Sequence, residues 1–145
     1  MRVLLVEDDL TTARGVALML RSSGAVIDQA DTGEEAMELA RHYEYDIVIL
    51  DLMLPDVEGY DVVRRIRAAR NSVPILILSG LSRPQAKVKA LAIGADDFLT
   101  KPFDRDELTA RLQAVMRRSK GYSQPTLRVG NLQLNLDSRE VLVDN

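Results

Sequence analysis

The sequence predicts an α/β protein: a doubly wound, five-stranded parallel sheet with five helices, followed by a short antiparallel β segment. In the first part of the chain, five short apolar runs alternate with five stretches of helical spacing. Two of these runs are apolar almost without interruption, which is typical of parallel strands covered on both faces. Past residue 125 the pattern changes to short runs of alternating apolar and polar residues. These three observations favour a layered α/β domain with a small unit after it.

The five apolar runs are the expected strands, and the third and fourth are the most continuous. In chain order they cover residues 3–6, 25–27, 47–50, 75–78 and 98–99. The carboxyl ends of parallel strands meet at one edge of a doubly wound sheet, where such folds bind their ligands. The residues that directly follow each run are therefore the first candidates for function.

Between the strands, apolar residues recur at intervals of three and four, which is the spacing of one helix face. The second helix also has a start signal, because Thr32 and Glu35 have the spacing of a capping box. The positions that mark the five helices are Ala13, Val16, Ala17 and Leu20; Ala36, Leu39 and Ala40; Val62, Val63 and Ile66; Val88, Leu91 and Ala92; and Leu108, Leu112 and Val115.

The composition excludes several classes of protein. The 145 residues are 46% hydrophobic and 28% charged, an ordinary globular balance that argues against disorder. Cysteine is absent, which excludes a disulfide scaffold, a Cys-ligated zinc site and a thiol nucleophile. The apolar runs are too short for a membrane span, and the N-terminus lacks a signal-peptide pattern, so we expect a cytoplasmic protein with no membrane partner. The only histidine, His42, lies on the second expected helix and predicts no acid–base catalysis.

The charge changes sign along the chain. The net charge is −3, but the acidic excess lies before residue 117 and a basic excess follows it. Gly, Ser, Gln and Pro residues also gather there, so we expect a domain at 1–118 and a linker at 119–125. Residues 126–145 read as the first strands of a truncated second domain, because so short a meander is not stable alone. The acidic first domain is not expected to bind nucleic acid itself.

Charged and hydroxyl side chains follow four of the five strands. They are Glu7, Asp8 and Asp9 after the first, Asp51 after the third, Ser79 after the fourth and Lys101 after the fifth. Clustered carboxylates repel one another unless a cation intervenes, and oxygen ligands without His or Cys suit Mg²⁺. A carboxylate beside Mg²⁺ can accept a phosphoryl group, with a hydroxyl and an ammonium to neutralise its oxygens. Taken singly, Asp8 or Asp9 would instead be read as a helix N-cap.

The motifs at these strand ends resemble the receiver domain of two-component response regulators. The resemblance covers residues 1 to about 118, and the tail resembles the opening strands of the winged-helix domain of the OmpR/PhoB subfamily. It implies a flavodoxin-like sheet of order 2-1-3-4-5. The motifs are Val6-Glu7-Asp8-Asp9; Ile49-Leu50-Asp51-Leu52-Met53-Leu54-Pro55 with Gly59; Ile77-Leu78-Ser79-Gly80; and Gly94-Ala95-Asp96-Asp97-Phe98-Leu99-Thr100-Lys101-Pro102-Phe103.

The resemblance implies that Asp51 accepts a phosphoryl group from a histidine kinase or a histidine phosphotransfer protein. Asp8, Asp51 and the backbone carbonyl of Met53 would bind Mg²⁺ directly, and Glu7 would act through water. Asp51 is then a phosphoacceptor in a switch, and the protein is not an enzyme that turns over external substrates. Its complete form would control transcription through a DNA-binding domain that is largely absent from these 145 residues.

The resemblance also implies a switch. Lys101 would pair with Asp51 and then with the phosphoryl group, through a cis Lys101-Pro102 bond. Ser79 would hydrogen-bond a phosphoryl oxygen, and Phe98 would turn into the space that this movement vacates. Ser79 stands where Thr is commoner and Phe98 where Tyr is commoner, and neither change removes the function.

Members of the subfamily form homodimers through the fourth helix, fifth strand and fifth helix. The expected cross-dimer ion pairs are Lys87 with Glu107, Asp97 with Arg111, and Asp96 with Arg118, around an apolar centre of Val88, Leu91 and Ala110. The alternative is that these charges are merely solvated, because an exposed pair contributes less than about 1 kcal/mol.

Two further functions compete with the switch. An aspartate-nucleophile phosphohydrolase of the haloacid dehalogenase type usually has a second Asp two residues after the nucleophile, and Met53 occupies that place here. A phosphorylation-independent interaction module would not need the intact acidic cluster, Ser79 and Lys101. Met53 and Leu81, two residues after Asp51 and Ser79, are both apolar and cannot orient a water, which predicts slow hydrolysis of a phospho-aspartate.

Overall fold

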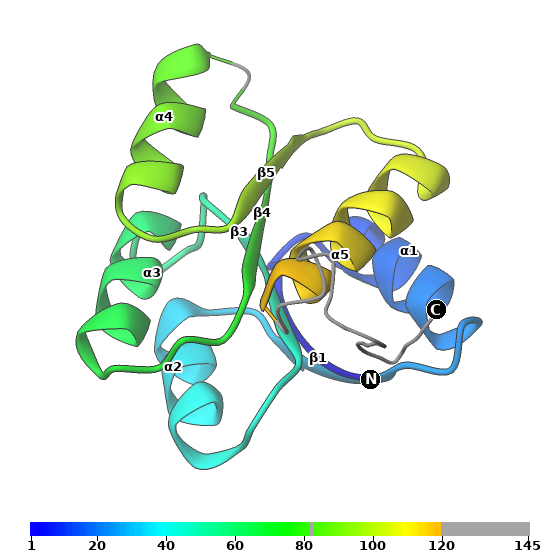
Figure 1. Cartoon of the computed structure of the whole chain (residues 1–145), viewed down its shortest axis with the longest axis horizontal. Helices are drawn as coiled ribbons and strands as arrows, with labels where there is room; N and C mark the ends of the chain where they lie inside the picture. Colours follow the sequence, from blue (N-terminus) through cyan, green and yellow to red (C-terminus); the bar gives the residue numbers. More distant parts are fainter. Residues whose placement is uncertain (82, 120–145) are drawn as a thin grey trace, which may run out of the picture. The chain divides into compact units, whose positions relative to one another are not determined.

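The computed structural model describes residues 1–81 and 83–119 and contains the expected five-stranded parallel sheet. The strand order is β2-β1-β3-β4-β5, with every neighbouring pair parallel, which confirms the predicted doubly wound fold (Figure 1). The reversal of strand order falls between β1 and β3. The strands are β1 (Arg2–Val6), β2 (Val26–Ala30), β3 (Ile47–Asp51), β4 (Ile75–Ser79) and β5 (Asp97–Thr100).

Five helices connect and follow the strands, as expected. In Figure 1, α1 and the first part of α5 lie on one side of the sheet, and α2, α3 and α4 lie on the other. Strands covered on both faces must be apolar on both, and β3 and β4 are buried at every residue. The helices are α1 (Leu10–Arg21), α2 (Gly33–His42), α3 (Gly59–Ala68), α4 (Pro84–Ala92) and α5 (Arg105–Ser119).

The second strand was the least accurate prediction. It runs from Val26 to Ala30 rather than over residues 25–27, because its polar residues Asp28 and Gln29 break the apolar run. Among the described strands, β2 lies at the edge of the sheet and pairs with β1 alone, over the full span from Arg2↔Val26 to Val6↔Ala30. An edge strand is held by its backbone ladder and needs apolar side chains on fewer positions.

The fourth helix exists as predicted, and two of the apolar residues that marked it, Val88 and Leu91, are exposed. Ala90 is the only buried residue of α4, whereas Val88 is 66% exposed and Leu91 is 38% exposed. The interval of three between Val88 and Leu91 does mark one helix face, but that face points to solvent. Helical spacing shows that residues share a face and cannot show what the face packs against.

The second helix starts as its sequence predicts. The Thr32 hydroxyl oxygen accepts a hydrogen bond from the Glu35 N–H at 3.1 Å. In a capping box the Glu35 carboxylate would accept from the Thr32 N–H. Here it accepts instead from the N–H of the preceding residue, Asp31, at 3.3 Å. The lone histidine, His42, ends this helix with an exposed side chain, as expected.

The predicted boundary of the first domain at residue 118 falls in the last turn of α5 and stays a prediction. α5 continues to Ser119, one residue beyond the expected end at 118. The rest of the predicted linker at 119–125 and the predicted β strands of 126–145 lie outside the described residues. Among the helices that the structure describes, none is long and apolar enough to cross a membrane.

Candidate functional site

Three carboxylates gather at the carboxyl edge of the sheet. Glu7 follows β1, Asp8 is next to it, and Asp51 is the last residue of β3. One carboxylate oxygen from each lies within 4.8 Å of the others, so a single small cation could contact all three. Glu7 and Asp51 are buried, while Asp8 is exposed at the rim. The site therefore has a buried interior and one open side.

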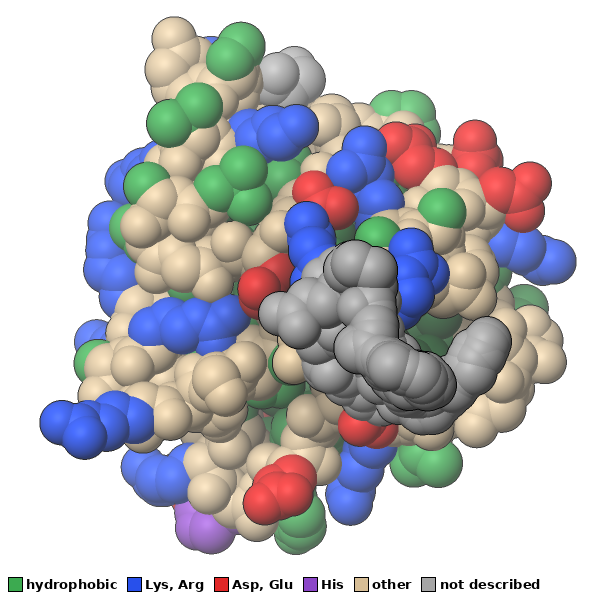
Figure 2. Space-filling view, viewed as in Figure 1, with side chains coloured by type: hydrophobic (Ala, Val, Ile, Leu, Met, Phe, Trp, Pro, Cys, Tyr) green, Lys and Arg blue, Asp and Glu red, His purple; other side chains and the backbone are tan. Residues whose placement is uncertain are grey.

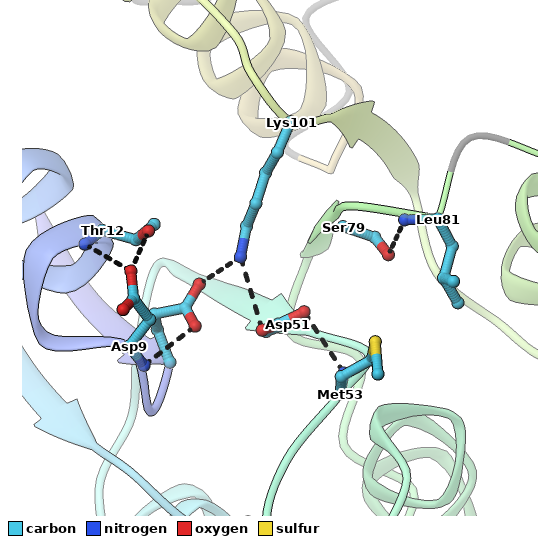
Figure 3. A network of polar contacts seen from close by, with 8 residues as sticks. Asp9, Thr12, Asp51, Met53, Ser79, Leu81 and Lys101 are labelled. Carbon is cyan, nitrogen blue, oxygen red and sulfur yellow. Dashed lines mark hydrogen bonds and ion pairs between the residues drawn. The ribbon is translucent and has the colours of Figure 1, made fainter.

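Asp9, which the sequence groups with these acids, has a different role. Its carboxylate accepts hydrogen bonds from the N–H of Thr12 at 3.0 Å and from the Thr12 hydroxyl at 2.5 Å (Figure 3). These bonds lower the pKa of Asp9 and make it the N-cap of α1. The N-cap interpretation is thus right for Asp9 and does not apply to Asp8.

Lys101 reaches into the acidic cluster from the loop after β5. Its ammonium is 2.7 Å from Glu7 Oε1 and 3.4 Å from Asp51 Oδ2 (Figure 3). Lys101 thus binds Glu7 more closely than Asp51, the partner that the sequence predicts. Burial pulls the pKa of the ammonium down, but the Glu7 hydrogen bond and the Asp51 charge outweigh it, so this pKa lies above its usual 10.5. The Lys101-Pro102 bond is cis, as expected.

The buried carboxylate of Glu7 has a raised pKa. Its burial in the protein is the largest cause, because desolvation penalises the charged form. The neighbouring Asp51 carboxylate raises the pKa further, and the bond to Lys101 opposes both effects. A cation at this site would relieve the remaining repulsion, so the donor set suits a hard, oxygen-seeking metal such as Mg²⁺.

The loop after Asp51 folds back closely against the backbone of Asp51 and Leu52. The Met53 N–H donates to Asp51 Oδ1 at 3.2 Å, and the Gly59 N–H donates to the Leu52 carbonyl at 2.7 Å. A Cβ built at Gly59 would overlap the Asp51 carbonyl oxygen and lie 2.6 Å from Leu52 Cα. Only glycine fits there. The motif that contains Gly59 does not by itself reveal this role.

Ser79 and Phe98 lie on neighbouring strands at the other side of Asp51. The Ser79 side chain is fully buried, and its Oγ accepts a hydrogen bond from the Leu81 N–H at 3.0 Å (Figure 3). Phe98 is buried in β5, directly across from Ile77 of β4. The hydroxyl is thus tied to its own loop, and the aromatic ring fills the protein interior.

Comparison with known proteins identifies the family. The model of the response regulator receiver domain matches residues 3–113. The chain belongs to the response regulator receiver family. Receivers are phosphoacceptor switches that bind Mg²⁺ at an acidic pocket, and Glu7, Asp8 and Asp51 form an acidic group that could hold such an ion.

Relatives of this receiver include cell-cycle regulators. It is 50% identical over 144 residues to the cell cycle transcriptional regulator CtrA of Caulobacter vibrioides (strain NA1000 / CB15N), covering 99% of this chain and 62% of that protein. The cell cycle response regulator CtrA of Brucella abortus (strain 2308) is 49% identical over 143 residues, with the same coverage. The chain is a homologue of CtrA and spans 62% of the length of these relatives.

Solved structures show the same fold. The Francisella response regulator 1452 receiver domain is 32% identical, with a TM-score of 0.77 over 81% of this chain and 98% of that one. The receiver domain of the sensor histidine kinase PA1611 of Pseudomonas aeruginosa, solved with magnesium coordinated in its active-site cleft, is 35% identical. Its TM-score is 0.74 over 79% of this chain and 96% of that one.

Four of the charges expected to pair across a dimer, Asp96, Asp97, Glu107 and Arg111, form pairs within this receiver. Arg111 binds the Asp97 carboxylate through two contacts of 3.1 Å and reaches Glu107 at 3.3 Å. Asp96 binds Arg67 of α3 at 3.0 Å. These in-chain pairs do not test the dimer itself, but any cross-dimer pairing of Asp96, Asp97 or Arg111 has to compete with them.

Proposed function

We propose that this receiver accepts a phosphoryl group on Asp51 from a histidine kinase or a histidine phosphotransfer protein. The observation that supports this most directly is the buried Asp51 carboxylate, flanked by two other acids and reached by the Lys101 ammonium. Asp51 Oδ attacks phosphorus as the P–N bond of the phosphohistidine breaks, and the imidazole leaves with the electron pair and takes up a proton. The product is an acyl phosphate on Asp51.

Mg²⁺ would be held by carboxylate oxygens of Asp8 and Asp51 and by the backbone carbonyl of Met53, with Glu7 acting through water. The three acids meet the ligand preference of this ion, and the related Pseudomonas receiver coordinates magnesium in its cleft. The bound ion would neutralise charge on the transferring group. Lys101 supplies a second positive charge, 3.4 Å from Asp51 Oδ2 (Figure 3).

The switch would work through Ser79 and Phe98. The Ser79 hydroxyl leaves its bond to the Leu81 N–H and donates to a phosphoryl oxygen, which draws the loop after β4 toward Asp51. The Phe98 ring, already buried in this conformation, would then pack further into the space that this loop vacates. Receivers respond in this way because a ligand shifts a pre-existing equilibrium between two conformations.

The test is the intact mass of the protein after incubation with acetyl phosphate. We expect one phosphoryl adduct with Mg²⁺ and none when EDTA replaces it. Asp51→Asn, which keeps the shape of the side chain and removes the nucleophile, should form no adduct. Folded protein without an adduct would favour the phosphorylation-independent interaction module, and release of free phosphate in many turnovers would favour a phosphohydrolase.

The phosphorylated state should be long-lived. Met53 is 63% exposed at the mouth of the site, and Leu81 flanks the site from the other side (Figure 3). Both side chains are apolar, so neither can hold a water in line with phosphorus. Met53→Asn with Leu81→Glu should shorten the adduct half-life by about tenfold, because an oriented water attacks more often. The half-life is read from the mass spectrum after the donor is removed. An unchanged or longer half-life would contradict the prediction.

We propose that phosphorylation promotes a homodimer through α4, β5 and α5. Hydrophobic side chains gather over α4, with charges of both signs beside them (Figure 2). Val88 and Leu91 are exposed at this face, and Ala110 is exposed on α5. The ion pairs would involve Lys87, Asp96, Asp97, Glu107, Arg111 and Arg118. In the longer protein the dimer would place DNA-binding domains on a promoter and control transcription, as the name of the Caulobacter relative indicates for that protein.

One substitution tests this dimer. Leu91→Asp should weaken phosphorylation-dependent association by roughly 30-fold, or about 2 kcal/mol, because the dimer would bury an unpaired charge. Sedimentation velocity with acetyl phosphate and Mg²⁺ measures the association. Leu18→Asp on α1 is the matched control, since Leu18 is also exposed but lies outside the proposed face. Equal dimerisation of both variants would place the interface elsewhere.

A further inference from the structure

The loop between β3 and α3 is tied to the start of α2 by one carboxylate. Asp56 Oδ1 accepts a hydrogen bond from the Gly33 N–H at 2.8 Å, and Oδ2 accepts one from the Glu34 N–H at 3.0 Å. The first N–H groups of a helix have no partner within the helix, and Thr32 satisfies only that of Glu35. Asp56 therefore completes the N-cap of α2 from a distant part of the chain.

The loop and the helix approach each other closely at Gly33. A Cβ at Gly33 would overlap Cγ2 of Val57 and lie 3.5 Å from Asp56 Oδ1. The two hydrogen bonds to the helix N-terminus also lower the pKa of Asp56, so its carboxylate is charged at neutral pH. The carboxylate is thus a fixed and directional link.

The same loop carries the peptide that flanks Asp51. Met53 donates its N–H to Asp51 Oδ1 at 3.2 Å and pairs with Glu58 in a short antiparallel bridge. Gly59 closes the loop on the Leu52 carbonyl. The loop is therefore closed at its base beside Asp51, and Asp56 anchors its tip to α2.

We propose that Asp56 is a positioning residue for the Mg²⁺ and phosphoryl site: its bonds to α2 fix the loop that presents the Met53 peptide to Asp51. This inference rests on the proposed Mg²⁺ site. A loop held in the binding geometry before the ion arrives loses less conformational freedom on binding, and so binds more tightly. Without the anchor, the Met53 carbonyl would become ordered only when Mg²⁺ binds, and the entropy lost in that ordering would lower the Mg²⁺ affinity.

Isothermal titration with MgCl₂ alone tests the proposal, without any phosphodonor. Asp56→Ala should weaken Mg²⁺ binding by about threefold to tenfold, at or below the loss that follows removal of an outer-shell partner at metal sites. Thr32→Ala is the matched control, because it removes a cap of the same helix and does not touch the loop. Thr32→Ala should lower the melting temperature and leave the Mg²⁺ affinity unchanged.

A second measurement separates positioning from general destabilisation. The rate of adduct formation from acetyl phosphate should require more Mg²⁺ in Asp56→Ala and return to the wild-type rate when Mg²⁺ saturates. Asp56→Asn keeps an acceptor for one of the two N–H groups, so its Mg²⁺ requirement should lie between those of wild type and Asp56→Ala. This variant also provides a readout if Asp56→Ala does not fold.

Three results would overturn the inference. If Asp56→Ala binds Mg²⁺ as tightly as wild type, the anchor does not position the site. The same conclusion follows from Asp56→Asn if only that variant folds. Equal weakening in Thr32→Ala would show that any damage to the α2 cap has the same effect. Absence of Mg²⁺ binding by the wild-type protein would overturn the proposed metal site together with this inference, and so is distinguishable from the first two.

Discussion

Lys101→Met is expected to slow phosphoryl transfer to Asp51 by about 100-fold, the lower end of the loss when a preorganised charge-stabilising group is removed. The Lys101 ammonium lies 3.4 Å from Asp51 Oδ2, where it can stabilise negative charge on the transferring group. Methionine has a similar length and no charge. The measurement is the rate of adduct formation from acetyl phosphate at saturating Mg²⁺.

Lys87→Met on α4 provides the control for this experiment. It makes the same chemical change at an exposed position, away from the acidic cluster, and should leave the rate unchanged at protein concentrations too low for the dimer to form. If Lys101→Met phosphorylates as fast as wild type, Lys101 contributes only to the structure of the resting site.

Lys101→Met should also change how the stability of the receiver depends on pH. Glu7 has a raised pKa, so the folded protein holds this proton more tightly than the unfolded chain, whose carboxyl titrates near 4.5. In EDTA, the free energy of unfolding therefore increases as pH falls through the range between these two values. Lys101 lowers the pKa of Glu7, so Lys101→Met should extend this range to higher pH. Urea unfolding between pH 4 and pH 8 measures it, and identical pH profiles would contradict the role of Lys101.

Gly59→Ala is expected to destabilise the receiver by about 2 to 3 kcal/mol, because the added methyl group forces backbone apart. The methyl would overlap the Asp51 carbonyl oxygen, which cannot move without displacing the end of β3. For a domain of this size the melting temperature should fall by roughly 10 °C. Thermal unfolding by circular dichroism measures the change.

Gly15→Ala is the matched control. Gly15 lies in α1, and a Cβ there would meet no atom within 4 Å. Alanine favours the helix over glycine, so this variant should be more stable than wild type by roughly 0.5 to 1 kcal/mol. If both variants are as stable as wild type, the loop after Asp51 can move away from β3 at little cost.

Local pattern was sufficient for the strands and helices that follow a strong rule. β1, β3 and β4 are nearly unbroken apolar runs, and each lies within one residue of its predicted bounds. The pattern gave wrong bounds for β2, where Asp28 and Gln29 interrupt the run, and it could not show that Val88 and Leu91 of α4 are exposed. Edge position and solvent exposure depend on neighbours that are distant in the chain.

The candidate site was accessible to sequence reasoning because parallel topology is a strong constraint. Once the strands are parallel, their carboxyl ends share an edge, and the acids after β1 and β3 have to meet there. Asp56 and Gly59 escaped this reasoning, since neither follows a strand. One signal of a constrained turn was present here: three turn-forming residues in one short loop, Pro55, Asp56 and Gly59.

The sequence by itself determined the fold class, the strand order through its family resemblance, and the set of residues at the strand ends, because each follows from periodicity or motif. Only the tertiary structure decided how these residues pair. Lys101 binds Glu7 more closely than Asp51, Arg111 closes on Asp97 within the chain, and Asp56 reaches back to α2. Such pairings depend on separations of a few ångströms between segments far apart in sequence, and electrostatic and hydrogen-bond energies fall steeply over that distance.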